Sequence, residues 1–280
     1  MDTFGSRTTS AAAEALPVIS RRAMLAAPLL ALPARVAQSR THAASGTAFV
    51  LVHGAWHGGW CWSRVVSALA RKGHHRVYAQ SLTGLGDRSH LLRPDLALQT
   101  HVQDVVNLAE WENLDSIVLC GHSYGGMVVT GAAEHLRSRL RAIVYLDAFL
   151  PHAPNMSLLD MSTAESRANR EAIAQRNAGL LPPLTAEAMK VNPADRAWVD
   201  GKCTPHPFLT FKQGLPAVEA HERVERKVYV RATASPSPVF DRIANERRNR
   251  PGWRVIDLSF GHDLMVDAPQ QVTDILVGAL

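Results

Sequence analysis

Hydrophobic residues of the chain form short continuous runs that alternate with longer amphipathic stretches. From residue 47 on, the runs of strand length are 48–52, 76–79, 116–120, 142–146, 228–230 and 253–258. Residues 62–71, 101–111, 126–136 and 269–280 have the apolar spacing of helices. Continuous apolar runs are typical of strands that are buried on both faces. The alternation predicts an α/β fold with a doubly wound, mostly parallel sheet and helices on both faces.

Residues 151–222 interrupt this alternation. They are rich in Ala, Glu, Arg, Pro and Asn, and residues 163–177 and 185–190 have helical character. An insertion of about 70 residues is too long for a simple connection between two strands. We therefore expect a helical cap at 151–222; the alternative is an irregular excursion without a role in the site.

The first 45 residues have the pattern of a targeting segment. Arg21 and Arg22 directly precede residues 23–34, which are apolar and uncharged. This is the layout of a secretion signal, and the arginine pair is similar to a twin-arginine export signal. We therefore expect residues 1–45 to be an export signal or a disordered leader, and residues 46–280 to be the folded domain. The expected location is periplasmic or secreted, or cytoplasmic if the leader is not functional.

Composition narrows the class of protein. Hydrophobic residues make up 46% of the 280 residues and charged residues 20%, which excludes a fully disordered chain, a collagen and a coiled coil. No apolar run reaches the roughly 20 residues of a membrane span, so we expect no stable membrane insertion. The net charge is +5, but residues 1–44 hold five Arg against Asp2 and Glu14, so the folded part gives no reason to expect nucleic-acid binding. The three cysteines have no metal-site spacing and are too few for a disulfide framework.

A serine lies in a glycine-rich turn near the middle of the chain. Residues 121–125 are Gly-His-Ser-Tyr-Gly, which fits the pattern Gly-x-Ser-x-Gly between a predicted strand and a predicted helix. So sharp a turn requires strained backbone angles at Ser123, and glycines on both sides remove side chains that would clash. We therefore expect Ser123 to be a nucleophile at a helix N-terminus, whose dipole favours developing negative charge.

A serine hydroxyl needs a base and a site for the oxyanion. In the chain order serine, acid, histidine the base comes last, and His262 lies just after the last predicted strand. The expected oxyanion donors are the backbone N–H groups of Tyr124 and of Ala55, in the loop after the first strand. His53 and His57 of that loop could act as acid–base groups, but we expect them to shape the loop.

Three motifs together resemble a known family. They are VLVHGAWHGGWCW at residues 50–62, GHSYGG at 121–126 and GHDLMV at 261–266. In this order they are similar to the α/β-hydrolase superfamily, and more closely to its branch of plant methylesterases, hydroxynitrile lyases and bacterial esterases. The resemblance covers residues 47–280. It implies hydrolysis of carboxylic esters through an acyl-enzyme without a cofactor, and we expect no metal site.

The acid of the expected triad departs from the family pattern. In the family it follows the penultimate strand, but here that loop, residues 234–238, contains no carboxylate. Asp147 directly follows the strand at 142–146 and opens onto the expected catalytic edge of the sheet. We favour Asp147 as the acid that orients His262. Asp241, a few residues beyond the empty loop, is the alternative, and an Asp147 that only caps a turn is a third possibility.

We expect a serine carboxylesterase that acts on small-to-medium apolar esters. The expected pocket residues are Trp56, Phe149 and Leu150, with Trp198, Phe208 and Phe211 of the cap. The same triad would also serve a lactonase, an amidase or a hydroxynitrile lyase, but the lyases carry Thr and Lys where this chain has Gly54 and Asp263. A non-catalytic ligand-binding protein on the hydrolase fold is the remaining alternative. The expected partner is a small-molecule ester, and no oligomeric state is indicated.

Overall fold

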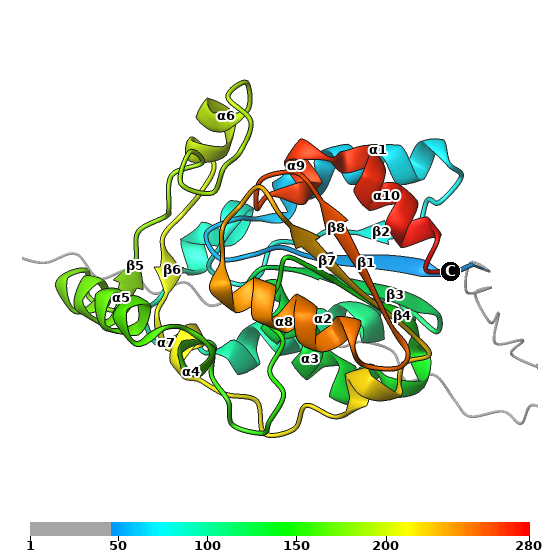
Figure 1. The fold of residues 1–280 in the computed structure, drawn as a ribbon, viewed down its shortest axis with the longest axis horizontal. Coiled ribbons are helices and arrows are strands. Elements are labelled where there is room, and N and C mark those ends of the chain that lie inside the picture. The colour runs from blue at the N-terminus through cyan, green and yellow to red at the C-terminus, as the bar shows by residue number, and fades with distance from the viewer. Residues whose placement is uncertain (1–45) are drawn as a thin grey trace, which may run out of the picture. The chain divides into compact units, whose positions relative to one another are not determined.

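The computed structural model describes residues 46–280. The predicted export signal lies outside the described residues. Within them, the chain forms a six-stranded sheet with helices on both faces and a small two-stranded sheet (Figure 1). None of the helices in residues 46–280 is both long enough and apolar enough to span a membrane.

All strands of the main sheet are parallel, in the order β2-β1-β3-β4-β7-β8. Their bounds are Ala48–Val52 (β1), Val77–Tyr78 (β2), Ile117–His122 (β3), Leu140–Leu146 (β4), Arg226–Ala232 (β7) and Trp253–Leu258 (β8). Val52 is in register with Gly121, and His122 is in register with Leu146. The carboxyl ends of β1, β3 and β4 therefore lie side by side, and so do the loops that follow them.

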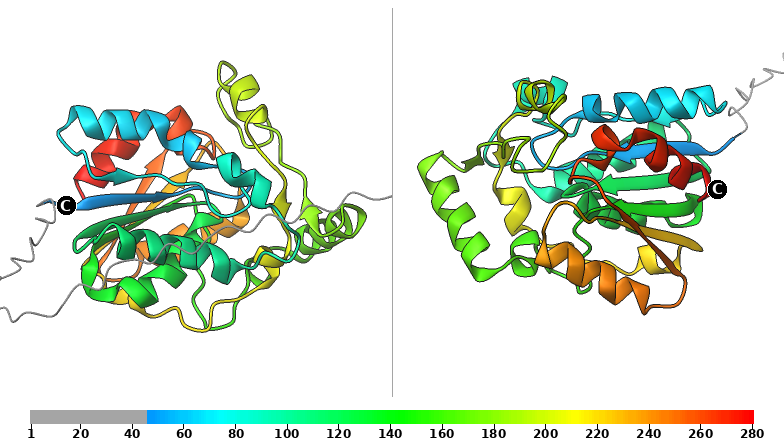
Figure 2. Two further views of the ribbon diagram at one scale, coloured as in Figure 1. Left: turned by 180° about the vertical axis from the view of Figure 1, so that it is seen from behind. Right: turned by 45° about the horizontal axis from the view of Figure 1, so that its top comes forward.

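Helices cover both faces of this sheet (Figures 1 and 2). One face carries α1 (Ser63–Arg71), α9 (Leu264–Asp267) and α10 (Pro269–Val277), and the other carries α2 (Leu98–Trp111), α3 (Gly125–Leu136) and α8 (Pro238–Arg248). Alternate residues of β1 enter the two apolar cores: Val50 packs with α2 and α3, and Leu51 with α1 and α10. Because both faces are covered, the residues of β1 and β3 are buried throughout. The predicted doubly wound parallel sheet is confirmed.

Residues 151–222, the cap segment, consist mostly of short elements. These are α4 (Leu158–Met161), α5 (Ala164–Arg176), α6 (Arg196–Asp200), α7 (Leu209–Lys212), a 3₁₀ turn at Ala220–Arg223, and the antiparallel strands β5 (Leu180–Leu181) and β6 (His206–Pro207). The segment lies beyond the end of the main sheet at which the strands finish (Figures 1 and 2). Prolines interrupt it at Pro182, Pro183 and Pro193, where the missing N–H groups prevent longer helices.

The helix expected at residues 185–190 is not present. These residues form a turn that ends at Lys190, whose φ of 62° is left-handed. The N–H of Met189 still bonds the carbonyl of Thr185 as in a helix, but the helical partner of the Met189 carbonyl would be residue 193, a proline without an N–H. That carbonyl instead accepts a hydrogen bond from the backbone N–H of His262 at 2.9 Å, more than 70 positions away along the chain.

Candidate active site

Ser123 lies in the turn between β3 and α3, with a left-handed φ of 52°. The turn requires its glycines, because a Cβ at Gly121 would lie 2.6 Å from the carbonyl oxygen of Gly125, and one at Gly126 would lie 2.1 Å from that of Phe149. Within residues 46–280, Ser123 Oγ has no hydrogen-bond partner, and the side chain lines a cavity. The strained turn therefore presents an unengaged hydroxyl to that cavity.

The expected oxyanion donors belong to residues that line the same cavity. Neither the backbone N–H of Ala55 nor that of Tyr124 donates a hydrogen bond to another described residue. The loop of Ala55 is tightly packed against the serine turn, since a Cβ at Gly54 would lie 2.9 Å from the Cβ of Ser123. Two unpaired N–H groups next to a serine are the donors that a tetrahedral oxyanion needs.

The structure brings His262 to Asp147. His262 Nδ1 lies 2.6 Å from Asp147 Oδ2. Asp147 directly follows β4 with a φ of 43° and is fully buried, while His262 lines the cavity together with Ser123. A carboxylate at Nδ1 fixes the tautomer in which Nε2 is left for proton transfer.

Arg231 on β7 links both carboxylates that the sequence offers as the acid. Its Nη1 donates to Asp147 Oδ1 at 2.9 Å, and its Nε donates to Asp241 Oδ1 at 2.7 Å. Burial lowers the pKa of Arg231, but the charges of the two carboxylates outweigh this effect and raise it. Asp241 is 56% exposed, makes its contact with Arg231 and makes none with His262. The geometry therefore favours Asp147 as the partner of His262, whereas Asp241 is a counter-charge of Arg231.

A second buried histidine–aspartate pair lies next to the first. His57 Nε2 is 2.9 Å from Asp263 Oδ2, and His57 Nδ1 donates to the carbonyl of Ala55 at 2.8 Å. Burial opposes the charge on each side chain, but the mutual attraction is stronger, so the pKa of His57 is raised and that of Asp263 is lowered. The pair joins the loop of Ala55 to the residue that follows His262.

Two more buried histidines contact backbone groups of the site. His53 Nδ1 donates to the carbonyl of Gly54 at 2.8 Å, and its Nε2 accepts from the N–H of Leu82 at 3.0 Å. Burial lowers the pKa of His53 to about 3, which keeps it neutral, and both ring nitrogens are occupied. His122 Nε2 donates to the carbonyl of His262 at 3.0 Å. These contacts support loop shape and leave His53 without a ring nitrogen for acid–base chemistry.

A cavity of about 330 Å³ connects Ser123 with the cap segment. Its lining comprises Ala55, Trp56, Ser123, Tyr124, Phe149, Leu158, Ser162, Thr163, Ser166, Arg170, Leu184, Ala188, Met189, Phe211, Ser235, Pro236, Ser237, Pro238, Val239, Phe240 and His262. Trp56 and Phe149 thus lie where the sequence predicts. Leu150 does not line the cavity, because it is almost fully buried in the apolar core that Phe149 also contacts. Of the three cap aromatics expected there, Phe211 alone lines the cavity.

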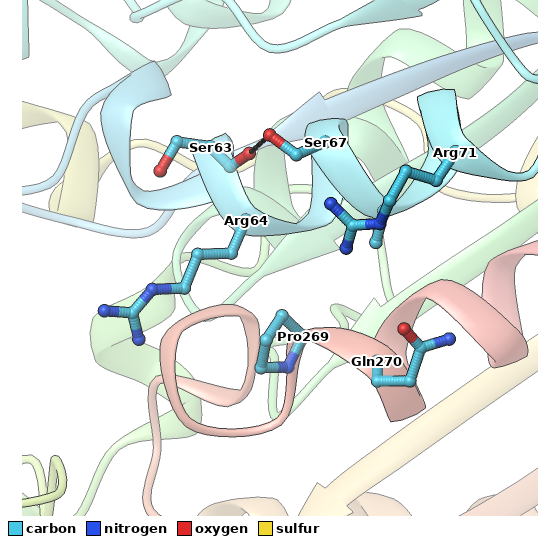
Figure 3. A pocket seen from close by; sticks show the side chains of 7 residues that line it. Ser63, Arg64, Ser67, Arg71, Pro269 and Gln270 are labelled. Atoms are coloured by element: carbon cyan, nitrogen blue, oxygen red, sulfur yellow. Dashed lines mark hydrogen bonds between the residues drawn. The ribbon is translucent and has the colours of Figure 1, made fainter.

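Another hollow lies between α1 and α10, apart from these residues (Figure 3). Its lining contains none of the candidate catalytic residues, and its Arg64 is held by Asp195 through hydrogen bonds of 2.6 and 2.7 Å. Residues 46–280 contain no group of three or more His, Cys, Asp or Glu side chains placed to hold a metal ion. The cavity at Ser123 is therefore the candidate active site.

Sequence reasoning missed Arg231 and the pairing of His57 with Asp263. Arg231 directly follows the apolar run 228–230 of β7, and a charge in a buried part of a strand is a signal that a partner carboxylate is near. His57 and Asp263 are 206 positions apart, and no local signal connects them.

Comparisons with known proteins identify the family of the chain. The sequence model of the alpha/beta hydrolase family matches residues 49–275. The carbendazim hydrolyzing esterase of a Nocardioides species is 39% identical over 235 residues, which are 81% of this chain and 96% of that protein. Salicylic acid-binding protein 2 of Nicotiana tabacum is 35% identical over 113 residues, covering 40% of this chain and 43% of that protein.

Solved structures resemble the whole described fold. An extracellular alpha/beta-hydrolase from a Paenibacillus species superimposes with a TM-score of 0.72 at 22% identity and covers 84% of this chain and 99% of that chain. A pyrethroid hydrolase from Sphingobium faniae gives a TM-score of 0.62 at 20% identity and covers 83% and 97%. At this level of identity, these likenesses are evidence for the fold.

Proposed function

The chain belongs to the alpha/beta hydrolase family, with esterases among its relatives, and we propose that it is a serine carboxylesterase working through an acyl-enzyme on Ser123. The observation that carries this proposal is the cavity shared by Ser123 and His262, with Asp147 2.6 Å from the histidine ring. Two unpaired backbone N–H groups line the same cavity.

The first half of the reaction forms the acyl-enzyme. Ser123 Oγ attacks the ester carbonyl, and His262 Nε2 takes its proton. Asp147 stabilises the resulting imidazolium, while the N–H groups of Ala55 and Tyr124 hold the oxyanion. When the tetrahedral intermediate collapses, the bond to the alcohol oxygen breaks and His262 returns the proton to the leaving alcohol.

The second half releases the acid. A water molecule takes the place of the alcohol, His262 Nε2 accepts one of its protons, and the hydroxide attacks the acyl carbon. Collapse of the second intermediate breaks the bond to Ser123 Oγ, which recovers its proton from His262. The products are one alcohol and one carboxylic acid, and the enzyme returns to its starting state.

The cavity supports small-to-medium substrates with apolar parts. Its volume of about 330 Å³ suits a ligand of modest size, and Phe149, Phe211 and Phe240 supply apolar wall. Hydroxynitrile cleavage is disfavoured, because this chain has Gly54 where the lyases have Thr. A side chain would not fit there, since a Cβ at Gly54 would lie 2.8 Å from His122 Nδ1. Carbendazim is the first specific compound to test, since the relative that hydrolyses it matches over 96% of its own length.

Initial rates with p-nitrophenyl acetate and butyrate test this function. The wild type should show saturable hydrolysis, and Ser123→Ala should reduce kcat by about 10⁶-fold, as loss of the nucleophile does in serine hydrolases. The variant should keep the wild-type melting temperature, which separates lost chemistry from lost folding. Saturable ester binding without hydrolysis in the wild type would instead support a ligand-binding protein.

We also propose that residues 1–45 direct export. The support is the arginine pair before an uncharged apolar stretch. Amino-terminal sequencing of the mature protein from its native host should find a start near residue 45. A start at Met1 would contradict export with cleavage.

A further inference from the structure

One cationic side chain lines the cavity without a counter-charge. Arg170 lies on α5 in the cap segment and is part of the cavity lining. The lining contains no Asp or Glu, and no carboxylate oxygen in residues 46–280 lies within 4.0 Å of the Arg170 guanidinium. The one side-chain hydrogen bond of Arg170 goes from Nη1 to the hydroxyl of Ser162 at 2.9 Å.

The surroundings of Arg170 withdraw it from water. Its Cζ lies 5.7 Å from the ring centroid of Phe211, and burial lowers the pKa of Arg170 with no acid nearby to raise it. Arg170 is half-buried, and its guanidinium keeps N–H donors that have no partner among residues 46–280 and that an anion in the cavity would accept. Uncompensated groups of this kind are retained mainly at functional sites, where a ligand completes them.

Arg167 on the same helix shows what a structural arginine looks like here. It lies one turn before Arg170, and its Nη2 forms an ion pair with Asp160 at 2.9 Å. The same guanidinium donates to the backbone carbonyl of Leu159. Arg167 does not line the cavity. One arginine of α5 therefore holds the cap segment together, while the other offers unused donors to the site.

Resting on the proposed function, we propose that Arg170 binds a carboxylate of the substrate, so that the ester cleaved at Ser123 carries a second, free carboxylate. Substrates of this class are half-esters of dicarboxylic acids and esters of carboxylated alcohols. The planar guanidinium matches a carboxylate with two parallel hydrogen bonds. The hydroxyl of Ser162 already donates to the carbonyl of Leu158, but Thr163 and Ser166 line the cavity in the same stretch, and their hydroxyls can supply further donors. A single cation suits a monoanion better than a phosphate dianion.

Matched ester pairs test this proposal. On the acyl side, the mono-p-nitrophenyl esters of adipic, pimelic and suberic acid are compared with p-nitrophenyl hexanoate, heptanoate and octanoate, in which methyl replaces the carboxylate. On the alcohol side, para-acetoxybenzoate is compared with para-tolyl acetate. For each pair, the ratio of kcat/KM for the anionic ester to kcat/KM for the neutral ester is measured in the wild type and in three variants.

The wild type should prefer the anionic ester in at least one pair. Arg170→Met should lower that ratio roughly 10- to 100-fold, mainly through a higher KM for the anionic ester. Arg170→Lys keeps the positive charge but loses the planar guanidinium with its two parallel N–H donors. Its ratio should therefore lie between those of the wild type and Arg170→Met. Arg167→Met is the control on the same helix and should leave the ratio unchanged.

The results that would overturn the proposal are distinct. A wild-type preference for the neutral ester in every pair contradicts it, and so does an equal loss on both esters in Arg170→Met. Melting temperatures exclude misfolding as a cause, since removing an uncompensated cation should leave Arg170→Met at least as stable as the wild type.

Failure of the proposed function would look different. In that case no ester of either kind is hydrolysed, and the rates of Ser123→Ala equal those of the wild type. The carboxylate site is then tested by calorimetric titration with para-acetoxybenzoate. Binding by the wild type that is lost in Arg170→Met would support the carboxylate site. Equal binding by both proteins, or binding by neither, would contradict it.

Discussion

The charged side chains at the carboxyl ends of the strands have counter-charges, whereas the one charged side chain of the cap segment that lines the cavity, Arg170, has none. In the strand-end loops, charged side chains are paired across distant parts of the chain: His262 with Asp147, Asp147 with Arg231, and His57 with Asp263. In the cap segment, Arg170 faces the cavity with a hydroxyl as its one side-chain partner. The paired side chains at the end of the sheet hold each other in one arrangement, as the proposed reaction requires. Arg170 of the cap segment, in contrast, gains a counter-charge only when an anionic ligand binds. Substitutions in the first region should reduce turnover of all esters, and those in the second should act selectively.

Among the substitutions that compare the two regions, the largest expected effect concerns the acid. Asp147→Asn should lower kcat about 10⁴-fold on anionic and neutral esters alike, because the amide favours the wrong histidine tautomer. Asp241→Asn, which removes a half-exposed counter-charge of Arg231, should have a far smaller effect. Steady-state kinetics of both variants checks this. Near-normal kcat in Asp147→Asn together with loss in Asp241→Asn would reverse the assignment.

Breaking the buried pair of His57 and Asp263 should give the largest loss of stability. Asp263→Asn should lower the free energy of unfolding by about 3–5 kcal/mol, because it leaves a buried histidine without its counter-charge. Because the pKa of His57 is raised in the folded state, its stabilisation of the fold is complete below the ordinary pKa of 6.5. This stabilisation is lost as pH rises through the folded-state pKa. Because the pKa of Asp263 is lowered in the folded state, its stabilisation of the fold is complete above the ordinary pKa of 3.8. This stabilisation is lost as pH falls through the folded-state pKa.

Urea unfolding at several pH values measures this difference. The gap between wild type and Asp263→Asn should be widest between about pH 4 and 6.5 and should narrow in alkali. A gap that grows steadily toward alkaline pH would mean that the pair is not ionised as described.

Glycine substitutions compare the tightness of the two regions. At Gly126 a Cβ would lie 2.1 Å from the carbonyl oxygen of Phe149, whose N–H is bonded to the carbonyl of Ser123. Gly126→Ala should therefore displace the serine turn and cost about 100-fold in kcat/KM. In the cap segment, Gly201→Ala meets its nearest atom at 3.2 Å and should leave kcat/KM nearly unchanged. Equal losses in both variants would remove the distinction between the regions.

The smallest expected effect is that of an exposed ion pair in the cap segment. Arg196 and Glu187 lie 2.9 Å apart, but the Glu187 side chain is 74% exposed. Solvent and salt screen such pairs, so Glu187→Gln should change the free energy of unfolding by less than about 1 kcal/mol. The same urea titrations measure it, and a loss as large as that of Asp263→Asn would contradict the comparison.

Local patterns were enough to predict the framework and the candidate chemistry. The apolar runs predict the parallel sheet, and the glycines around Ser123 predict a strained turn, because both depend on residues adjacent in sequence. Asp147 was favoured because it directly follows a strand, and the structure brings it to His262. Leu150 lies in the apolar core and not in the cavity lining, and the sequence does not distinguish these two places because Phe149 and Leu150 are adjacent and both apolar.

Long-range pairings could not be predicted in this way. The contact between His57 and Asp263, and the bond from the His262 backbone to Met189, join positions that share no local pattern. In the cap segment the helical character of residues 163–177 corresponds to α5, but the sequence does not distinguish Arg170 from Arg167. Residues three positions apart lie on the same face of a helix, so the helical pattern does not separate the two arginines, and the packing of the cap segment decides which of them lines the cavity.

Covalent labelling of the nucleophile tests the central claim most directly. The wild type is incubated with paraoxon, an organophosphate that phosphorylates activated serines, and the modified residue is located by mass spectrometry of peptide fragments. The account predicts one label per chain, located on Ser123, with loss of esterase activity in proportion to labelling and no label in Ser123→Ala. Full activity after exposure, or inactivation with the label on another residue, would contradict it.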